Sequence, residues 1–305
     1  MATTTATPSR TATRSRAFPL KYFVLAFVFT WALWVPAAFE ARGLISSLPI
    51  PATFLGAFGP LAAAVVVTAQ ESGRAGLRSL FGRVVRWRVA PVWYAVSILG
   101  PLGLTLAAIG LHVVLGGQPP SLGLLAGALP TLGFASIYMM LTVALGEEVG
   151  WRGYALPALQ ARYNALIASL VLGVLWTLWH LPVFFNPDTF YSNLPFFLFL
   201  AYIVPFAVLI TWVFNSAGGS VLMAIFFHAV LNASGELWKT IPAYSVKPST
   251  AAEAVALNVH TNLMPAIVLW VAAIVVVLFY GPRDLSRRPR QELAAASDES
   301  RSRVQ

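Results

Sequence analysis

The 305-residue chain has no cysteine, and only 10% of its residues are charged. The absence of cysteine excludes disulfides, thiol catalysis, thiolate metal sites and palmitoylation. A metal ion in this chain would have to be held by His, Glu, Asp or Asn side chains and water. An ordinary soluble domain has roughly 25% charged residues. Because 58% of the residues are hydrophobic and the mean hydropathy is +0.74, a soluble globule and a disordered chain are both excluded.

Acidic residues are also few: 11 Asp and Glu stand against 20 Lys and Arg, which gives a net charge of +9. In a soluble protein this excess would suggest a nucleic-acid partner. In a membrane protein, basic residues collect in the loops on the cytoplasmic side. We therefore expect the lipid bilayer as partner and no nucleic acid.

The apolar residues form eight long stretches, each close to the roughly 20 residues that cross a bilayer. They lie near residues 20–39, 52–70, 91–115, 122–147, 164–185, 194–214, 217–235 and 262–281. This pattern predicts an all-α, polytopic transmembrane helix bundle of about eight spans. Arginines spaced among apolar residues in 76–89 indicate an amphipathic interfacial segment. No internal repeat is visible, which gives an inverted-repeat transporter no support.

These spans divide the chain into a cytoplasmic arm (1–19), an eight-span domain (20–282) and a charged cytoplasmic tail (283–305). With eight spans, 17 Lys and Arg lie on the side of the two termini and 3 on the other side. The excess predicts that both termini are cytoplasmic. The expected location is a cell membrane, crossed several times.

Ionisable residues at membrane depth are costly and indicate a functional site or a structural pair. Glu147, Glu148 and Arg152 close the fourth apolar stretch. Glu148 and Arg152 are four residues apart, so they share a helix face and can pair, while Glu147 points elsewhere and is free for another partner. The alternative is that both glutamates only cap a helix end at the membrane interface.

Three further polar side chains lie near or within apolar stretches. His180 follows Trp176 by one helical turn, and Asn232 follows His228 by one turn. Taken singly, His180 is more typical of an interfacial position than of a ligand, and the His228–Asn232 pair fits hydrogen bonding between helices as well as it fits catalysis. His112 is a further ionisable residue within a span.

Helix geometry brings these residues together if the fourth helix continues to Gln160 and the chain turns near residues 162–164. Glu147 and His180 would then lie about 22 and 27 Å from the turn, and His228 about 15 Å from its own turn on the same side. The predicted result is a cavity open to the cytoplasm that holds a carboxylate, two imidazoles and an amide. Such a set suits a catalytic divalent metal and its water, and therefore amide hydrolysis within the membrane.

The same residues resemble the motifs of the CPBP intramembrane metalloproteases, which include the type II CAAX prenyl endopeptidases and bacteriocin-processing or immunity proteins. The family pattern is Glu-Glu-x-x-x-Arg, then Phe-x-x-x-His, then His-x-x-x-Asn on different helices. Here it reads Glu147-Glu148 to Arg152, Trp176 to His180 and His228 to Asn232, closely matched over about 140–235. Trp176 departs from the usual phenylalanine, a change that keeps an aromatic ring and that we expect to be minor for the chemistry.

The resemblance implies a glutamate-dependent endopeptidase of the prokaryotic branch, acting on a peptide or membrane-protein substrate by CAAX-type or bacteriocin-leader processing. It implies that Glu147 activates water, with Glu148 and Arg152 holding the geometry. His180 and His228 would bind the metal or the water, and Asn232 would steady the oxyanion or complete the site. The expected metal is zinc, with Glu147, His180, His228 and Asn232 as its candidate ligands.

Two other functions compete with this one. A non-catalytic scaffold or bacteriocin-immunity protein of the same fold would not need an intact Glu, His, His and Asn set. A transporter would line a pathway with its polar residues, but here they cluster toward one side. The sequence therefore favours the endopeptidase.

Overall fold

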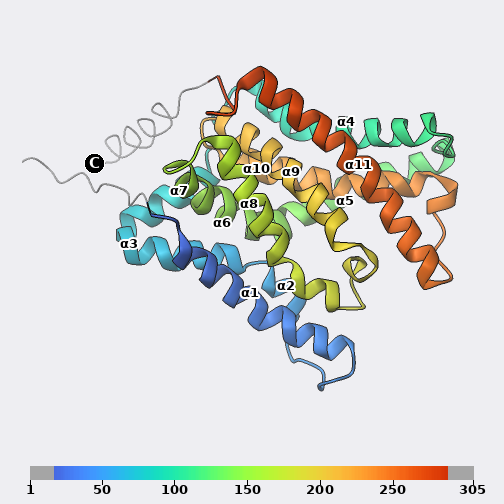
Figure 1. Cartoon of the computed structure of the whole chain (residues 1–305), viewed down its shortest axis with the longest axis horizontal. Coiled ribbons are helices and arrows are strands. Elements are labelled where there is room, and N and C mark those ends of the chain that lie inside the picture. The colour runs from blue at the N-terminus through green and yellow to red at the C-terminus, as the bar shows by residue number, and fades with distance from the viewer. Residues whose placement is uncertain (1–16, 288–305) are drawn as a thin grey trace, which may run out of the picture.

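The chain folds into a bundle of long helices, shown in Figure 1 by a computed structural model that describes residues 17–287. The described residues form no β-strand. Most of the predicted arm and of the predicted tail falls outside this range, so the division into three parts is still a prediction. The longer helices are α1 (Leu20–Ala41), α3 (Gly59–Val84), α4 (Pro91–Val114), α5 (Leu122–Met139), α8 (Ala165–Trp179), α9 (Phe196–Ser216), α10 (Val221–Ser234) and α11 (Ala251–Tyr280).

Shorter helices join or extend these. They are α2 (Ala52–Gly56), α6 (Leu145–Gly150), α7 (Leu156–Gln160), the π-helical η1 (Met140–Ala144) and η2 (Trp151–Ala155), and the 3-10 helices η3 (Leu181–Phe185), η4 (Phe190–Asn193), η5 (Gly235–Thr240) and η6 (Pro242–Tyr244). Together α5, η1, α6, η2 and α7 make one helix over 122–160, as the geometry of the site required. Asn164 then caps α8 by accepting a hydrogen bond from the Ile167 amide at 2.8 Å, which starts the return pass.

The described residues contain seven helices long and apolar enough to cross a membrane, where the apolar stretches predicted about eight. The predicted span that is not among these seven helices is 52–70, which forms α2 and the first half of α3. The helical conformation of α3 breaks at Gly73, where φ is 56° and ψ is −148°. A backbone conformation with positive φ suits glycine, which has no Cβ to clash.

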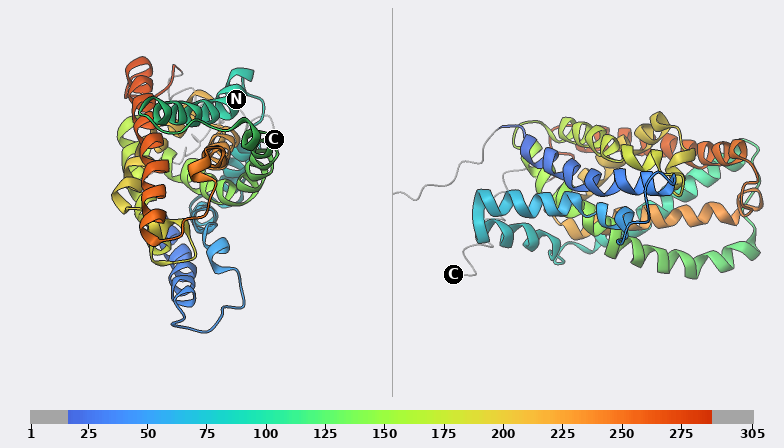
Figure 2. Two further views of the ribbon diagram at one scale, coloured as in Figure 1. Left: turned by 90° about the vertical axis from the view of Figure 1, so that its right-hand side faces the viewer. Right: turned by 90° about the horizontal axis from the view of Figure 1, so that it is seen from below.

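After Gly73 the chain turns back along the bundle, as Figure 2 (right) shows. A Cβ on Gly150 would touch Pro60 at 2.5 Å, and one on Gly153 would touch the Leu80 side chain at 2.9 Å. Pro60 and Leu80 therefore pack on neighbouring turns of one helix. The predicted amphipathic segment 76–89 is thus the returning half of α3 and the loop after it, tied down by Arg86, whose Nη1 donates to the Gly218 carbonyl at 2.6 Å.

Both ends of the described chain lie at one end of the bundle (Figure 2). At the start of α1, the Tyr22 ring lies 4.9 Å from the Tyr154 ring, centroid to centroid. Six residues further along the 122–160 helix, the Gln160 amide bonds Asn215 at the end of α9, and Asn215 Nδ2 donates to the Asp284 carbonyl just after α11. The chain therefore makes an even number of passes along the bundle, with the first half of α3 as the short one.

The helices that carry the candidate site form the centre of the bundle. In each of the apolar spans that contain α8, α9 and α10, more than half of the span's apolar centre is buried inside the molecule. The largest fully buried side chains include three tryptophans, Trp151, Trp176 and Trp179. The site is therefore enclosed by aromatic and aliphatic side chains, where electrostatic interactions are stronger than in water.

Candidate active site

The two glutamates of the candidate site lie on α6, in the middle of the 122–160 helix. One π-helical segment, η1, precedes α6 and another, η2, follows it. Single π-helical turns inside α-helices are rare and frequent at functional sites, because the extra residue re-aims the side chains. Glu147 is 2% exposed and Glu148 is fully buried, so both carboxyl groups lie at membrane depth inside the protein.

Glu148 pairs with Arg152, as the four-residue spacing predicted. Arg152 Nη1 lies 2.9 Å from Glu148 Oε1, and both side chains are 0% exposed. The same Oε1 lies 2.8 Å from Nδ1 of His228 on α10. The pair therefore links the 122–160 helix to α10, and the interface-cap alternative is excluded by the burial.

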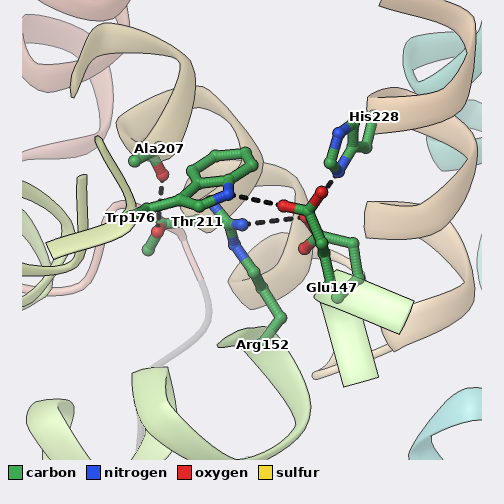
Figure 3. A network of polar contacts seen from close by, with 7 residues as sticks. Glu147, Arg152, Trp176, Ala207, Thr211 and His228 are labelled. Atoms are coloured by element: carbon green, nitrogen blue, oxygen red, sulfur yellow. Dashed lines mark hydrogen bonds and ion pairs between the residues drawn. The ribbon is translucent and has the colours of Figure 1, made fainter. Parts of the chain in front are cut away.

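Glu147 has a separate partner, which is Trp176 on α8 (Figure 3). The indole Nε1 of Trp176 donates to Glu147 Oε2 at 2.5 Å. The guanidinium carbon of Arg152 lies 4.7 Å from the centre of the Trp176 ring, a cation–π distance. Trp176, which the motif comparison treated as a minor departure, is thus the residue of α8 that contacts the catalytic candidates.

His180 lies one turn beyond Trp176, at the C-cap of α8. Its Nδ1 lies 2.9 Å from the Trp176 carbonyl oxygen, and its ring lies in an aromatic cage that includes Trp179, with centroids 4.6 Å apart, and Phe199, at 5.0 Å. No hydrogen bond joins His180 to Glu147 or Glu148 among the described residues. The prediction that His180 and Glu147 face one another at similar depth stays a prediction, and the residue of α8 that bonds Glu147 is Trp176, one turn earlier.

The hydrogen bonds at Nδ1 determine the tautomer of each imidazole. A carbonyl oxygen only accepts, so His180 carries its proton on Nδ1, and an ionised Glu148 sets the same tautomer in neutral His228. In both neutral rings Nε2 then holds a lone pair. Neither Nε2 has a hydrogen-bond partner in the part of the chain that the structure describes, so both are able to accept from water.

The same orientation is the one that protein imidazoles adopt when they bind metals, with Nδ1–H on a carbonyl or carboxylate. The positions of the donors do not follow this pattern. Within 17–287, no three His, Asp or Glu side chains lie close enough together to hold a metal ion. The donor atoms are thus of the types that bind zinc, but these side chains are not grouped closely enough to hold the ion. The zinc site stays a prediction.

Two of the polar residues lie apart from this network. Asn232 is half-buried one turn after His228 on α10, and its side chain makes no hydrogen bond to any described residue. His112 on α4 belongs elsewhere, because its Nδ1 lies 2.7 Å from Nε2 of His260 on α11. The predicted role of Asn232 stays a prediction, and His112 takes no part in the site.

Comparison with known proteins places this network in a family. Residues 129–234 match the sequence model of a family described as type II CAAX prenyl endopeptidase Rce1-like, and this segment holds every residue of the predicted site. This match supports the CPBP family for the chain. A curated relative named CAAX prenyl protease 2, from Methanococcus maripaludis, is 28% identical over 239 residues, which cover 72% of this chain and 84% of the relative. These matches support a protease, and the seven apolar helices among the described residues support a multi-pass membrane protein.

Proposed function

We propose that the chain is an intramembrane endopeptidase in which Glu147 removes a proton from the attacking water. The observation that carries the proposal is the different pairing of the two carboxylates. Glu148 Oε1 contacts both Arg152 and His228, whereas Glu147 accepts from Trp176 at Oε2 and its Oε1 has no hydrogen-bond partner among the described residues. A general base needs one oxygen free to accept a proton. Glu148 Oε2 also lacks a partner, but Glu148 is the counter-ion of the buried Arg152, whereas Glu147 forms no ion pair with a described residue and is the carboxylate left to act as the base.

The proposed reaction is the hydrolysis of one amide bond. Water donates one hydrogen bond to Glu147 Oε1 and the other to the Nε2 lone pair of His180 or His228, and it attacks the carbonyl carbon as Glu147 takes its proton. The Asn232 amide donates to the oxyanion of the tetrahedral intermediate. Glu147 then returns the proton to the leaving nitrogen as the C–N bond breaks, which yields a carboxylate and an amine.

Zinc belongs to the proposal through the donor types alone. Glu147, His180, His228 and Asn232 are the residues that would hold it, and when bound it would lower the pKa of a water and polarise the carbonyl. Since the described residues do not form a three-donor group, the steps above depend on no metal. Metal analysis of the purified protein tests this part separately.

The substrate is a peptide or a membrane-anchored protein segment that reaches the site from the cytoplasm, in the cell membrane of a prokaryote. The relative's name, CAAX prenyl protease 2, makes a prenylated C-terminal peptide the first substrate class to test. A leader peptide of the bacteriocin type is the second.

The test compares wild-type protein with Glu147→Gln, which keeps the size of the side chain but removes the base. We expect the rate to fall by about 10²- to 10⁴-fold. Purified protein in detergent is given a farnesylated C-terminal peptide, the same peptide without the prenyl group, and a leader peptide, and membrane-protein fragments are quantified in cells. Glu236→Gln is the matched control, because Glu236 forms a solvent-accessible ion pair with Lys239 on η5, away from the site.

The competing function is a non-catalytic scaffold or immunity protein. It predicts that Glu147→Gln retains full biological function and leaves the fragment pattern unchanged. Equal fragments from the two cell populations, together with no cleavage of any of the three peptides, would refute the endopeptidase. Stoichiometric zinc that is lost in His180→Ala and His228→Ala would support the metal-dependent form, and its absence from active protein would contradict that form.

A further inference from the structure

Trp176 contacts four residues of the candidate site, which are Glu147, Arg152, His180 and His228. Its ring centroid lies 5.3 Å from that of His228 and 6.3 Å from that of His180, while the Arg152 guanidinium lies over its face. The side chain is only 1% exposed, so its position is set by packing from several helices. A single aromatic side chain thus lies among both imidazoles and the buried cation.

The polar edge of Trp176 points at the proposed base. Its Nε1–H donates to Glu147 Oε2 at 2.5 Å (Figure 3). The indole has only this one N–H, and it accepts nothing in return. The bond therefore fixes Oε2 and leaves Oε1 as the oxygen of Glu147 that can face water.

Arg152 cannot supply this restraint. Its Nη1 donates to Glu148, and its contact with Trp176 is to the ring face. Without the indole N–H, the Glu147 carboxylate would lose its hydrogen bond within the described residues and could rotate about its last side-chain torsion, which has a broad and roughly two-fold profile. A phenyl ring in the same place would fill much of the space and leave the carboxylate unanchored.

We propose that Trp176 is a positioning residue of the protease site: it anchors one oxygen of Glu147 through its indole N–H and thereby presents the other oxygen to the attacking water. This role rests on the proposed function of Glu147. It differs from a packing role, because it resides in one N–H group and not in the volume of the ring.

Two substitutions separate the N–H from the ring. Trp176→Phe removes the donor and part of the ring, whereas replacement of Trp176 with β-(3-benzothienyl)alanine keeps the two-ring shape and puts sulfur in place of N–H. We expect both to lower kcat by about 10- to 100-fold, since a small misplacement of a reacting group costs up to about 10²-fold. KM should stay within about twofold, because the anchored carboxylate acts on the water and not on substrate binding.

The matched control is Trp31→Phe. Trp31 on α1 also donates its indole N–H, to the Trp179 carbonyl oxygen at 2.9 Å, but it does not touch Glu147. We expect wild-type kcat for this control, with a melting temperature as low as that of Trp176→Phe or lower. Wild-type kcat in the benzothienylalanine protein would overturn the proposal, since shape alone would then suffice. Equal cleavage by wild-type and Glu147→Gln protein would instead refute the proposed function, and the role of Trp176 would fall with it.

Discussion

Removal of the Arg152 guanidinium should destabilise the fold more than loss of any exposed charge. Arg152 and Glu148 are both 0% exposed, and their nearest N and O atoms lie 2.9 Å apart. Opposite charges about 4 Å apart attract by ~4 kcal/mol at an effective dielectric constant near 20. Breaking a buried pair by removing one partner typically costs about 3–5 kcal/mol, because the other charge stays buried. Since His228 still contacts Glu148 in Arg152→Ala, we expect a loss of about 3 kcal/mol, at the lower end of that range.

Thermal unfolding in detergent, followed by circular dichroism, measures this loss. The matched control is Lys239→Ala, which breaks a helical ion pair whose lysine is 64% exposed and which should cost no more than about 1 kcal/mol. A double variant, Glu148→Gln with Arg152→Met, removes both charges and leaves an amide oxygen for His228. It should recover most of the lost stability, because Arg152 Nε, Arg152 Nη2 and Glu148 Oε2 have no partner in the described residues, so the native pair is itself incompletely satisfied. A melting temperature of Arg152→Ala equal to that of Lys239→Ala would refute the reasoning, since the pair would then be solvated.

Two further predictions concern the fold. Gly150→Ala places a Cβ 2.5 Å from the backbone of Pro60 on α3 and should cost about 1–3 kcal/mol or more in thermal unfolding, whereas Gly103→Ala, with open space around it, should be neutral or slightly stabilising. Equal melting temperatures would show that α3 does not pack on α6 as described. Reporter fusions should place residue 305 in the cytoplasm and the loop at Gly117 outside, because basic residues gather at the end of the bundle that holds both ends of the described chain. The reverse assignment would refute the expected orientation.

Local spacing predicted the parts of the site that lie on one helix. The interval between Glu148 and Arg152 was enough to predict their pairing, because side chains four residues apart on a helix are neighbours whatever the tertiary structure. The apolar runs predicted the helices for a similar reason, since a span needs only length and low polarity. The structure confirms both, together with the continuation of the 122–160 helix beyond the glutamates.

Features that depend on backbone irregularity were not predicted. The stretch 52–70 reads as a span, but the helix it begins breaks at Gly73 and turns back. A signal was present, because Glu71, Ser72, Gly73 and Arg74 interrupt the apolar sequence. Hydropathy alone cannot tell a break at the membrane surface from a polar continuation of the same helix. The π-helical segments η1 and η2 on either side of α6 have no comparable signal in the chain.

Partners across helices were the least predictable part of the site, because helix rotation decides them. Depth counted from the turns placed His180 opposite Glu147 only to within about 5 Å, which is the rise of one helical turn, and gave no information on the rotation of either helix. In the structure Trp176 contacts Glu147, through an indole N–H that phenylalanine lacks. A substitution that conserves aromatic volume thus changes the hydrogen bonding of the proposed base. Where a motif residue differs from its family pattern, the polar atoms it gains decide whether the difference is minor.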